Sequence, residues 1–139
     1  MKNIVLNIKS TQEIDGQSDS TEFVSCGTYE YRDDGVEVFY DESVALGIDH
    51  VKTKLSVKNG VVQILRNNGD FGALLIEEGK RHQCQYYTQY GNIVIGIYGN
   101  KVENNLNSSG GNINLIYSID VNSGLLSRNK VEIKIREEN

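Results

Sequence analysis

The stretch Asn112-Ile113-Asn114-Leu115-Ile116-Tyr117-Ser118-Ile119-Asp120-Val121 carries an apolar side chain at every second position. Residues of a β-strand point alternately to its two faces, so this pattern is typical of a strand with one buried face. The pattern recurs in residues 51–58, 92–98 and 129–136. No window of useful length shows an apolar stripe with the 3.6-residue period of a helix. The sequence therefore predicts an all-β chain.

Turn-forming pairs separate the strand-like runs, and they are Asp15-Gly16, Asp34-Gly35, Asn59-Gly60 and Asn68-Gly69. Such pairs tolerate the positive φ angles of tight hairpins. The order strand–turn–strand indicates an antiparallel meander, and closing a meander into a barrel removes its exposed edges. We therefore predict one domain over residues 1–139, an up-and-down β-barrel of about eight to ten strands. A two-sheet sandwich is the competing architecture, which the short hairpin loops favour less.

Composition excludes several classes of function. The 14 Lys and Arg residues are outnumbered by 19 Asp and Glu residues, which gives a net charge of −5 and argues against nucleic-acid binding. No apolar run approaches the roughly 18–20 residues that span a bilayer, and the N-terminus lacks the apolar block of a secretion signal. The two cysteines, Cys26 and Cys84, cannot define a disulfide framework. We expect a soluble cytoplasmic protein with free thiols.

The alternation also predicts which side chains point into the barrel. If the charged faces point to solvent, the polar and aromatic residues that point inward are Phe23, Ser25, Tyr29, Tyr31, Tyr40, Glu42, Thr53, His82, Tyr86, Thr88, Tyr117 and Asn129. The phase of residues 61–66 is ambiguous because both faces are mostly apolar, and Arg66 shares a face with Val62 and Ile64. A buried polar group without a partner costs about 1–3 kcal/mol. These groups therefore either satisfy one another or line a wet cavity.

The segment from Glu78 to Gly91, with His82 and Cys84 at its centre, resembles the central signature of the YwiB-like family of uncharacterised bacterial proteins. The resemblance covers nearly the whole chain through Gly27-Thr28-Tyr29, Tyr40-Asp41-Glu42, Thr53, Arg66 with Gly69, Val102-Glu103-Asn104-Asn105-Leu106, Gly110-Gly111, Tyr117 and Ser127-Arg128-Asn129. It implies a calycin-like β-barrel, related in shape to lipocalins and fatty-acid-binding proteins, and no assigned reaction. The chain has no Trp, the hallmark residue of lipocalins, so lipocalin ligands do not carry over.

Arg66 is the most informative charged residue, because an arginine inside a barrel cannot lose its proton and must be paired. Glu42 is an inward candidate for its partner. One interpretation is a buried ion pair that fixes strand register. The other is an arginine that holds a ligand carboxylate, as the wider calycin group implies. The predicted ligand-binding residues are Arg66, Tyr40, Glu42, His82, Tyr86, Thr88 and Tyr117.

Catalytic and metal sites have weaker support in the sequence. His82 and Cys84 lie two residues apart on one strand face, where a base and a nucleophile could meet. Nothing nearby in the sequence supplies a third, orienting group, and a buried cysteine is usually inert. A metal would need three or four ligands, and the chain has no paired-His or CxxC spacing. We therefore expect no catalytic residues, no metal and no cofactor.

Three functions remain open at this stage. The leading hypothesis is a small-molecule binding module with a polar and aromatic lumen. The first alternative is a structural or protein-interaction barrel with a filled interior, and the second is an enzyme that uses His82 with Glu42 or Cys84. An open lumen of roughly 300 Å³ or more would favour ligand binding. The sequence does not predict the oligomeric state.

Overall fold

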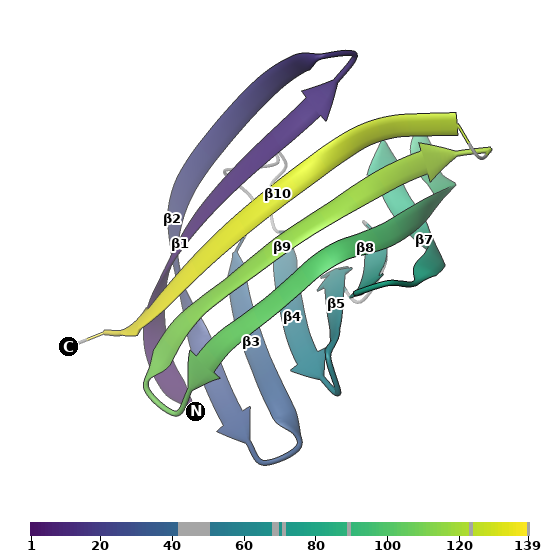
Figure 1. Ribbon diagram of the computed structural model, residues 1–139. Coiled ribbons are helices and arrows are strands. Elements are labelled where there is room, and N and C mark those ends of the chain that lie inside the picture. Colours follow the sequence, from purple (N-terminus) through teal and green to yellow (C-terminus); the bar gives the residue numbers. More distant parts are fainter. Residues whose placement is uncertain (42–50, 68–69, 71, 89, 123, 139) are drawn as a thin grey trace.

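The computed structural model describes residues 1–41, 51–67, 70, 72–88, 90–122 and 124–138. The described strands are β1 (Lys2–Ile14), β2 (Gln17–Arg32), β3 (Gly35–Asp41), β4 (Lys52–Lys58), β5 (Val61–Arg66), β6 (Gly72–Glu77), β7 (Arg81–Thr88), β8 (Gly91–Asn107), β9 (Gly110–Val121) and β10 (Gly124–Glu137). Each strand pairs antiparallel with its neighbours in sequence, and β1 pairs with β10 to close the barrel (Figure 1). The predicted all-β, up-and-down, calycin-like barrel is confirmed.

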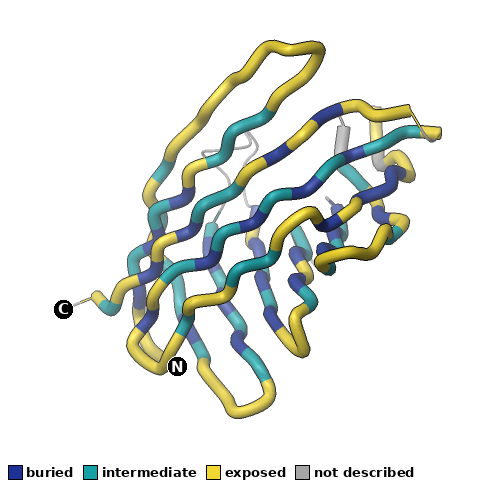
Figure 2. The backbone as a smooth tube through the Cα atoms, viewed as in Figure 1, coloured by how far each residue is buried: buried dark blue, intermediate teal, exposed yellow. Residues whose placement is uncertain are grey.

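The alternation predicted in the sequence sets the two faces of the front wall. In β9 the buried residues are Ile113, Leu115, Tyr117 and Ile119, and the residues between them are partly exposed. Figure 2 shows the same alternation along β9 and β10. The buried set removes apolar surface from water, which is the main driving force for folding. The core therefore lies inside the barrel, where the inward faces of all the walls meet.

Two-residue turns join several strands at the barrel ends. At Asp15–Gly16 and at Asn59–Gly60 both residues have positive φ, as the sequence predicts. The turn predicted at Asp34-Gly35 lies one residue earlier, since Arg32 pairs with Gly35 at the start of β3. The pair Asn68-Gly69 lies outside the described residues. We call the end that carries Asp15–Gly16 the upper end and the end that carries Asn59–Gly60 the lower end.

Side chains close the lower end of the barrel. The Tyr29 hydroxyl on β2 donates a hydrogen bond of 2.7 Å to the carbonyl of Asn107 at the end of β8, and β2 and β8 are not neighbours in the sheet. Lys2 Nζ donates to the Ser108 carbonyl and to Glu137 Oε1, each at 2.8 Å. These contacts tie the N-terminus, the C-terminal strand and the β8–β9 hairpin together.

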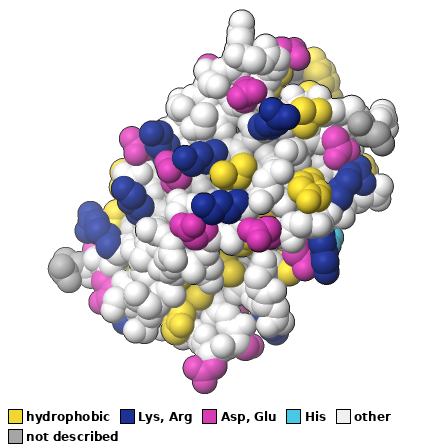
Figure 3. Space-filling model, viewed as in Figure 1, with side chains coloured by type: hydrophobic (Ala, Val, Ile, Leu, Met, Phe, Trp, Pro, Cys, Tyr) yellow, Lys and Arg dark blue, Asp and Glu magenta, His cyan; other side chains and the backbone are white. Residues whose placement is uncertain are grey.

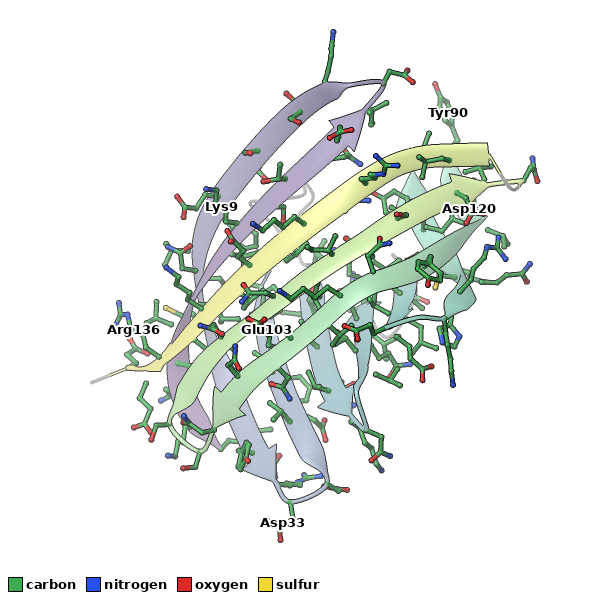
Figure 4. The ribbon with its side chains drawn as sticks, in the orientation of Figure 1. Lys9, Asp33, Tyr90, Glu103, Asp120 and Arg136 are labelled. Atoms are coloured by element: carbon green, nitrogen blue, oxygen red, sulfur yellow. The ribbon has the colours of Figure 1, made fainter. Side chains whose placement is uncertain are left out.

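On the outer face an ion pair spans three strands. Arg81 on β7 donates from Nε to Asp120 Oδ2 at 3.0 Å and from Nη2 to Asp120 Oδ1 at 2.7 Å. Asp120 lies on β9 and is labelled in Figure 4. The guanidinium crosses β8 at Gly96, where a Cβ atom would overlap it. The hydrogen bond from Arg81 holds the pKa of Asp120 below its usual value. A glycine at this position therefore allows β7 and β9 to interact across β8.

The outer surface carries charges of both signs. On the face shown in Figure 3, lysine and arginine side chains are interspersed with aspartate and glutamate. Exposed pairs such as Lys54 with Glu37 at 3.1 Å and Lys101 with Glu103 at 3.2 Å connect neighbouring positions. Within the described part of the chain, no helix is long and apolar enough to cross a bilayer.

Candidate functional site

The strand register brings three of the predicted residues into one line. Tyr40 on β3 pairs with Thr53 on β4, and Thr53 pairs with Arg66 on β5. Tyr40 and Thr53 are buried, and Arg66 is half-buried. Val62 and Ile64 are buried, which resolves the ambiguous phase of this strand and places Arg66 on the inward face. We call Tyr40, Thr53 and Arg66 the polar row.

The polar row continues toward β7 through a glycine. Leu65 pairs with Ala73, and Gly72 pairs with Tyr86, so Arg66 and Tyr86 end up on either side of Gly72. Tyr86 is half-buried and packs against the hydrophobic core. Because glycine has no side chain, the residue of β6 that lies between Arg66 and Tyr86 places no side chain between theirs.

Tyr117 is on the opposite wall of the barrel. It is buried on β9 and pairs with Asn129 on β10. Asn129 is itself buried and donates from Nδ2 to the Ser127 hydroxyl at 3.0 Å. In the strand order β9 and β10 lie across the barrel from β4 and β5 (Figure 1). The interior is therefore polar on two facing walls.

Buried polar groups of the described interior all have partners. No buried side-chain nitrogen or oxygen among the described residues lacks a hydrogen bond. Tyr40, Thr53, Arg66 and Tyr117 each make at least one hydrogen-bonding, ring or electrostatic interaction. A ligand at the polar row would therefore add to these interactions or exchange with them.

His82 belongs to a different cluster from the polar row. Its Nε2 lies 2.9 Å from Glu77 Oε1, and Lys80 Nζ lies 3.3 Å from Glu77 Oε2. The hydrogen bond with His82, helped by Lys80, lowers the pKa of Glu77. His82 precedes Tyr86 by four residues on β7, which is about 13 Å along a strand. The sequence placed His82 in one cluster with Arg66, whereas the strand geometry sets it well below the polar row.

The β6–β7 hairpin carries a β-bulge between the Glu77–Lys80 bridge and the Ala73–Gln85 pair. Glu77 faces Lys80 across the hairpin turn, and a ladder continued from that pair would place Ala73 opposite Cys84. Ala73 instead faces Gln85, so β7 carries one extra residue. Period-two alternation does not predict such a bulge.

The Cys84 thiol is buried beside this bulge. The Leu75 amide donates to Cys84 Sγ at 3.2 Å, and Sγ donates to the Leu75 carbonyl at 3.7 Å and to the His82 carbonyl at 3.8 Å. Burial raises the pKa of Cys84, which favours the unreactive thiol over the thiolate. These contacts assign Cys84 a structural role. Both cysteines are free, with Cys26 exposed.

Two predicted site residues cannot be placed, and no metal cluster is formed by the rest. Glu42 lies outside the described residues, and the side chain of Thr88 also lies outside them. In the described ranges no group of three or more His, Cys, Asp and Glu side chains is arranged to hold a metal ion.

A groove on the outer wall has a volume of about 630 Å³. Its lining residues are Cys26, Gly27, Thr28, Phe39, Tyr40, Asp41, Lys52, Thr53, Lys54, Leu65, Asn67 and Asp70. On each of β2, β3 and β4 the lining includes the two residues that flank an inward-facing residue in the sequence. Those flanking residues point outward, so the groove lies on the outer face of the barrel, behind the polar row. Lys52 Nζ bonds Asp41 Oδ2 at 3.0 Å, and its amide bonds Asn67 Oδ1 at 2.8 Å.

The sequence pattern predicts neither this groove nor the Glu77–His82 pair. The groove residues are on outer faces of four strands, and their only sequence signal is the apolar Phe39 and Leu65 among charged neighbours. Glu77 precedes the β6–β7 hairpin turn, and its contact with His82 is made across that hairpin. Both features follow from strand register, which local patterns do not determine.

The sequence matches the model of a domain of unknown function, DUF1934, over residues 6–133. The chain belongs to this family. The structure of this DUF1934 chain is similar to the crystal structure of the YwiB protein from Bacillus subtilis, with a TM-score of 0.83 and 22% sequence identity. The match covers 99% of this chain and 93% of the YwiB chain. The predicted resemblance to the YwiB-like family is thus confirmed, and no curated protein matches the sequence.

Proposed function

We propose that this DUF1934 protein is a binding module for a small anionic molecule that is held at the polar row. The observation that carries the proposal is the inward-facing Arg66, aligned by register with Tyr40 and Thr53. A guanidinium presents a planar fork of donors that matches a carboxylate or phosphate. The two hydroxyl groups add donors in the same line.

The barrel wall supports the rigidity that such a site needs. Thr53 lies at the centre of the row and is paired with a strand on each side, so its backbone is held by two ladders. Gly72 contributes no side chain between Arg66 and Tyr86. A ligand anion would lie between Arg66 and Tyr86, with its apolar part against the core residues. The proposed setting is the cytoplasm, where the exposed Cys26 thiol stays reduced.

A thermal-shift titration with acetate, benzoate, decanoate and inorganic phosphate tests this function. We expect at least one anion to raise the melting temperature of the wild type with saturation. A ligand at a hundred times its Kd stabilises the native state by about 2.7 kcal/mol. Arg66→Met should abolish the shift. Arg136→Met is the matched control, because Arg136 is an exposed arginine on the outer face, and it should respond like the wild type.

Three results would contradict this assignment. If no anion shifts the melting temperature, the alternative of a protein-interaction barrel with a filled interior would describe the protein better. An equal shift in Arg66→Met would move the anion site elsewhere. Loss of the shift in Lys54→Met, with Arg66→Met unaffected, would place the site in the outer groove.

The second candidate function is a protein-interaction barrel. It is supported by the complete pairing of buried polar side chains among the described residues, which is what a filled interior requires. In that case recognition would use the outer surface of the strands.

A further inference from the structure

Within the described residues, one half of β2 is paired with a strand on only one side. β2 pairs with β1 from Gln17 to Tyr29, but it pairs with β3 only from Gly27 to Arg32. Among the described residues, the segment 17–26 therefore ends the sheet on the β3 side. Figure 1 shows the upper half of β2 at the margin of the β1–β2 hairpin, on the side away from β10, and Figure 2 shows it exposed.

The register defines which backbone groups face this free edge. The pair Ile14–Gln17 flanks a two-residue turn and is hydrogen-bonded, so odd-numbered residues of β2 bond to β1. The pair Arg32–Gly35 flanks another two-residue turn, so even-numbered residues point toward the β3 side. Along the free edge the residues whose N–H and C=O groups point outward are Ser18, Ser20, Glu22 and Val24. All four residues are exposed, and Val24 is 65% exposed.

A second strand edge in this barrel shows how such groups are protected. β8 pairs with β7 only as far as Tyr98. Beyond it, the Val102 amide donates to Glu78 Oε1 at 3.0 Å, and the Leu106 amide donates to Asn104 Oδ1 at 3.1 Å. No described side chain caps the four outward residues of β2 in this way. That edge also lacks the lysine or proline that commonly blocks strand addition.

We propose that the free edge of β2 pairs antiparallel with the same edge of a second copy of this chain. The two-fold axis passes beside Thr21, so Ser20 lies opposite Glu22 of the second copy, and Ser18 lies opposite Val24. Every outward N–H and C=O group from Ser18 to Val24 then has a partner. The two barrels share one continuous sheet through a symmetric, self-complementary interface.

Charge selects this register over its neighbours. A shift that centres the axis on Glu22 would place the two Glu22 carboxylates directly opposite each other, which destabilises a strand pair. A shift that centres it on Ser20 would leave Val24 unpaired. With the axis at Thr21, the acidic residues Asp19 and Glu22 face Phe23 and Ser20 of the second copy.

The first test is the solution mass, measured by sedimentation from micromolar to sub-millimolar protein. We expect a concentration-dependent species of twice the 15.5 kDa chain mass. Glu22→Pro should be monomeric, because it removes an outward N–H and leaves the ladder to β1 intact. Glu22→Gln is the matched control, because it keeps that N–H, and it should still dimerise.

The second test is a disulfide that reports the register. In a Cys26→Ser background, Thr21→Cys should form an interchain disulfide on mild oxidation, because non-hydrogen-bonded partners have Cα atoms about 4.5 Å apart. Asp19→Cys lies on the same face of the same strand, but its symmetry mates would be about 13 Å apart and should not cross-link.

A monomer at every concentration would overturn the proposal. So would a dimer that survives Glu22→Pro, or equal cross-linking of Thr21→Cys and Asp19→Cys. The anion response of the polar row is measured separately, so failure of one proposal leaves the other standing.

Discussion

Tyr29 ties two non-neighbouring strands together at the lower end of the barrel. Its side chain is almost fully buried, with 1% exposure, and its hydroxyl donates to the Asn107 carbonyl. Burial, with a smaller contribution from Tyr31, raises the pKa of Tyr29 from 10.0 to about 12. The native state therefore favours the neutral phenol.

Tyr29→Phe should lower the free energy of unfolding by about 1 kcal/mol near neutral pH, because it removes one hydrogen bond. In the wild type the stabilisation from Tyr29 is complete below the unfolded pKa of 10.0 and declines as pH rises toward the folded value of about 12. Urea titrations at pH 7 and pH 11 should show a smaller loss of stability in Tyr29→Phe than in the wild type. Equal losses in the two proteins would contradict the burial of the phenol.

The alternation of a strand does not predict which side chain His82 contacts. The alternation of β7 correctly predicts Cys84 as buried and Arg81, Gln83 and Gln85 as exposed. It predicts the face of His82 but not its contact with Glu77, because that contact crosses a hairpin with a bulge. One extra residue in a strand changes which side chains meet, and no local periodicity records it.

At the scale of the strand, a substitution on the buried face of β10 should lower the free energy of unfolding much more than a substitution on its exposed face. Ile133 is buried and its neighbour Lys134 is exposed. Ile133→Ala should cost about 2–5 kcal/mol, whereas Lys134→Ala should lie within about 0.5 kcal/mol of the wild type. Urea denaturation of both variants measures the difference. Similar costs at the two positions would reject the assignment of faces.

Contacts between strands, in contrast, join residues that come together only in the assembled sheet. Arg81, Gly96 and Asp120 are on three different strands, and the sequence analysis assigned the glycine no role. Gly27–Tyr40–Thr53–Arg66 also forms a line only through three successive registers. A shift of one residue in any of them would turn one member to the outer face.

For the molecule as a whole, closure by β1 and β10 should govern cooperativity. Deletion of residues 1–9 would remove Ile4, Leu6 and Ile8 from the core and leave residues 22–29 of β2 and 132–137 of β10 without their partners on β1. We expect this truncation to abolish the cooperative unfolding transition seen by circular dichroism.

A circular permutant is the matched control for the truncation. The termini lie close together, since the Glu138 amide donates to the Asn3 carbonyl at 2.9 Å, and Figure 1 shows both at the lower end. Joining them and opening the chain at the Asp15–Gly16 turn keeps every strand pair. The permutant should unfold cooperatively; a stable truncation or an unfolded permutant would show that closure is not decisive.

Local sequence patterns predict the strands, several of the hairpin turns, most of the inward faces and the barrel family. These are local properties, because the period of two and the turn preferences act over a few residues. Only the tertiary packing sets Tyr40, Thr53 and Arg66 in one row, brings His82 to Glu77, and leaves half of β2 without a second neighbouring strand among the described residues. These outcomes depend on register, bulges and unequal strand lengths, which are set by how all the walls pack around one core.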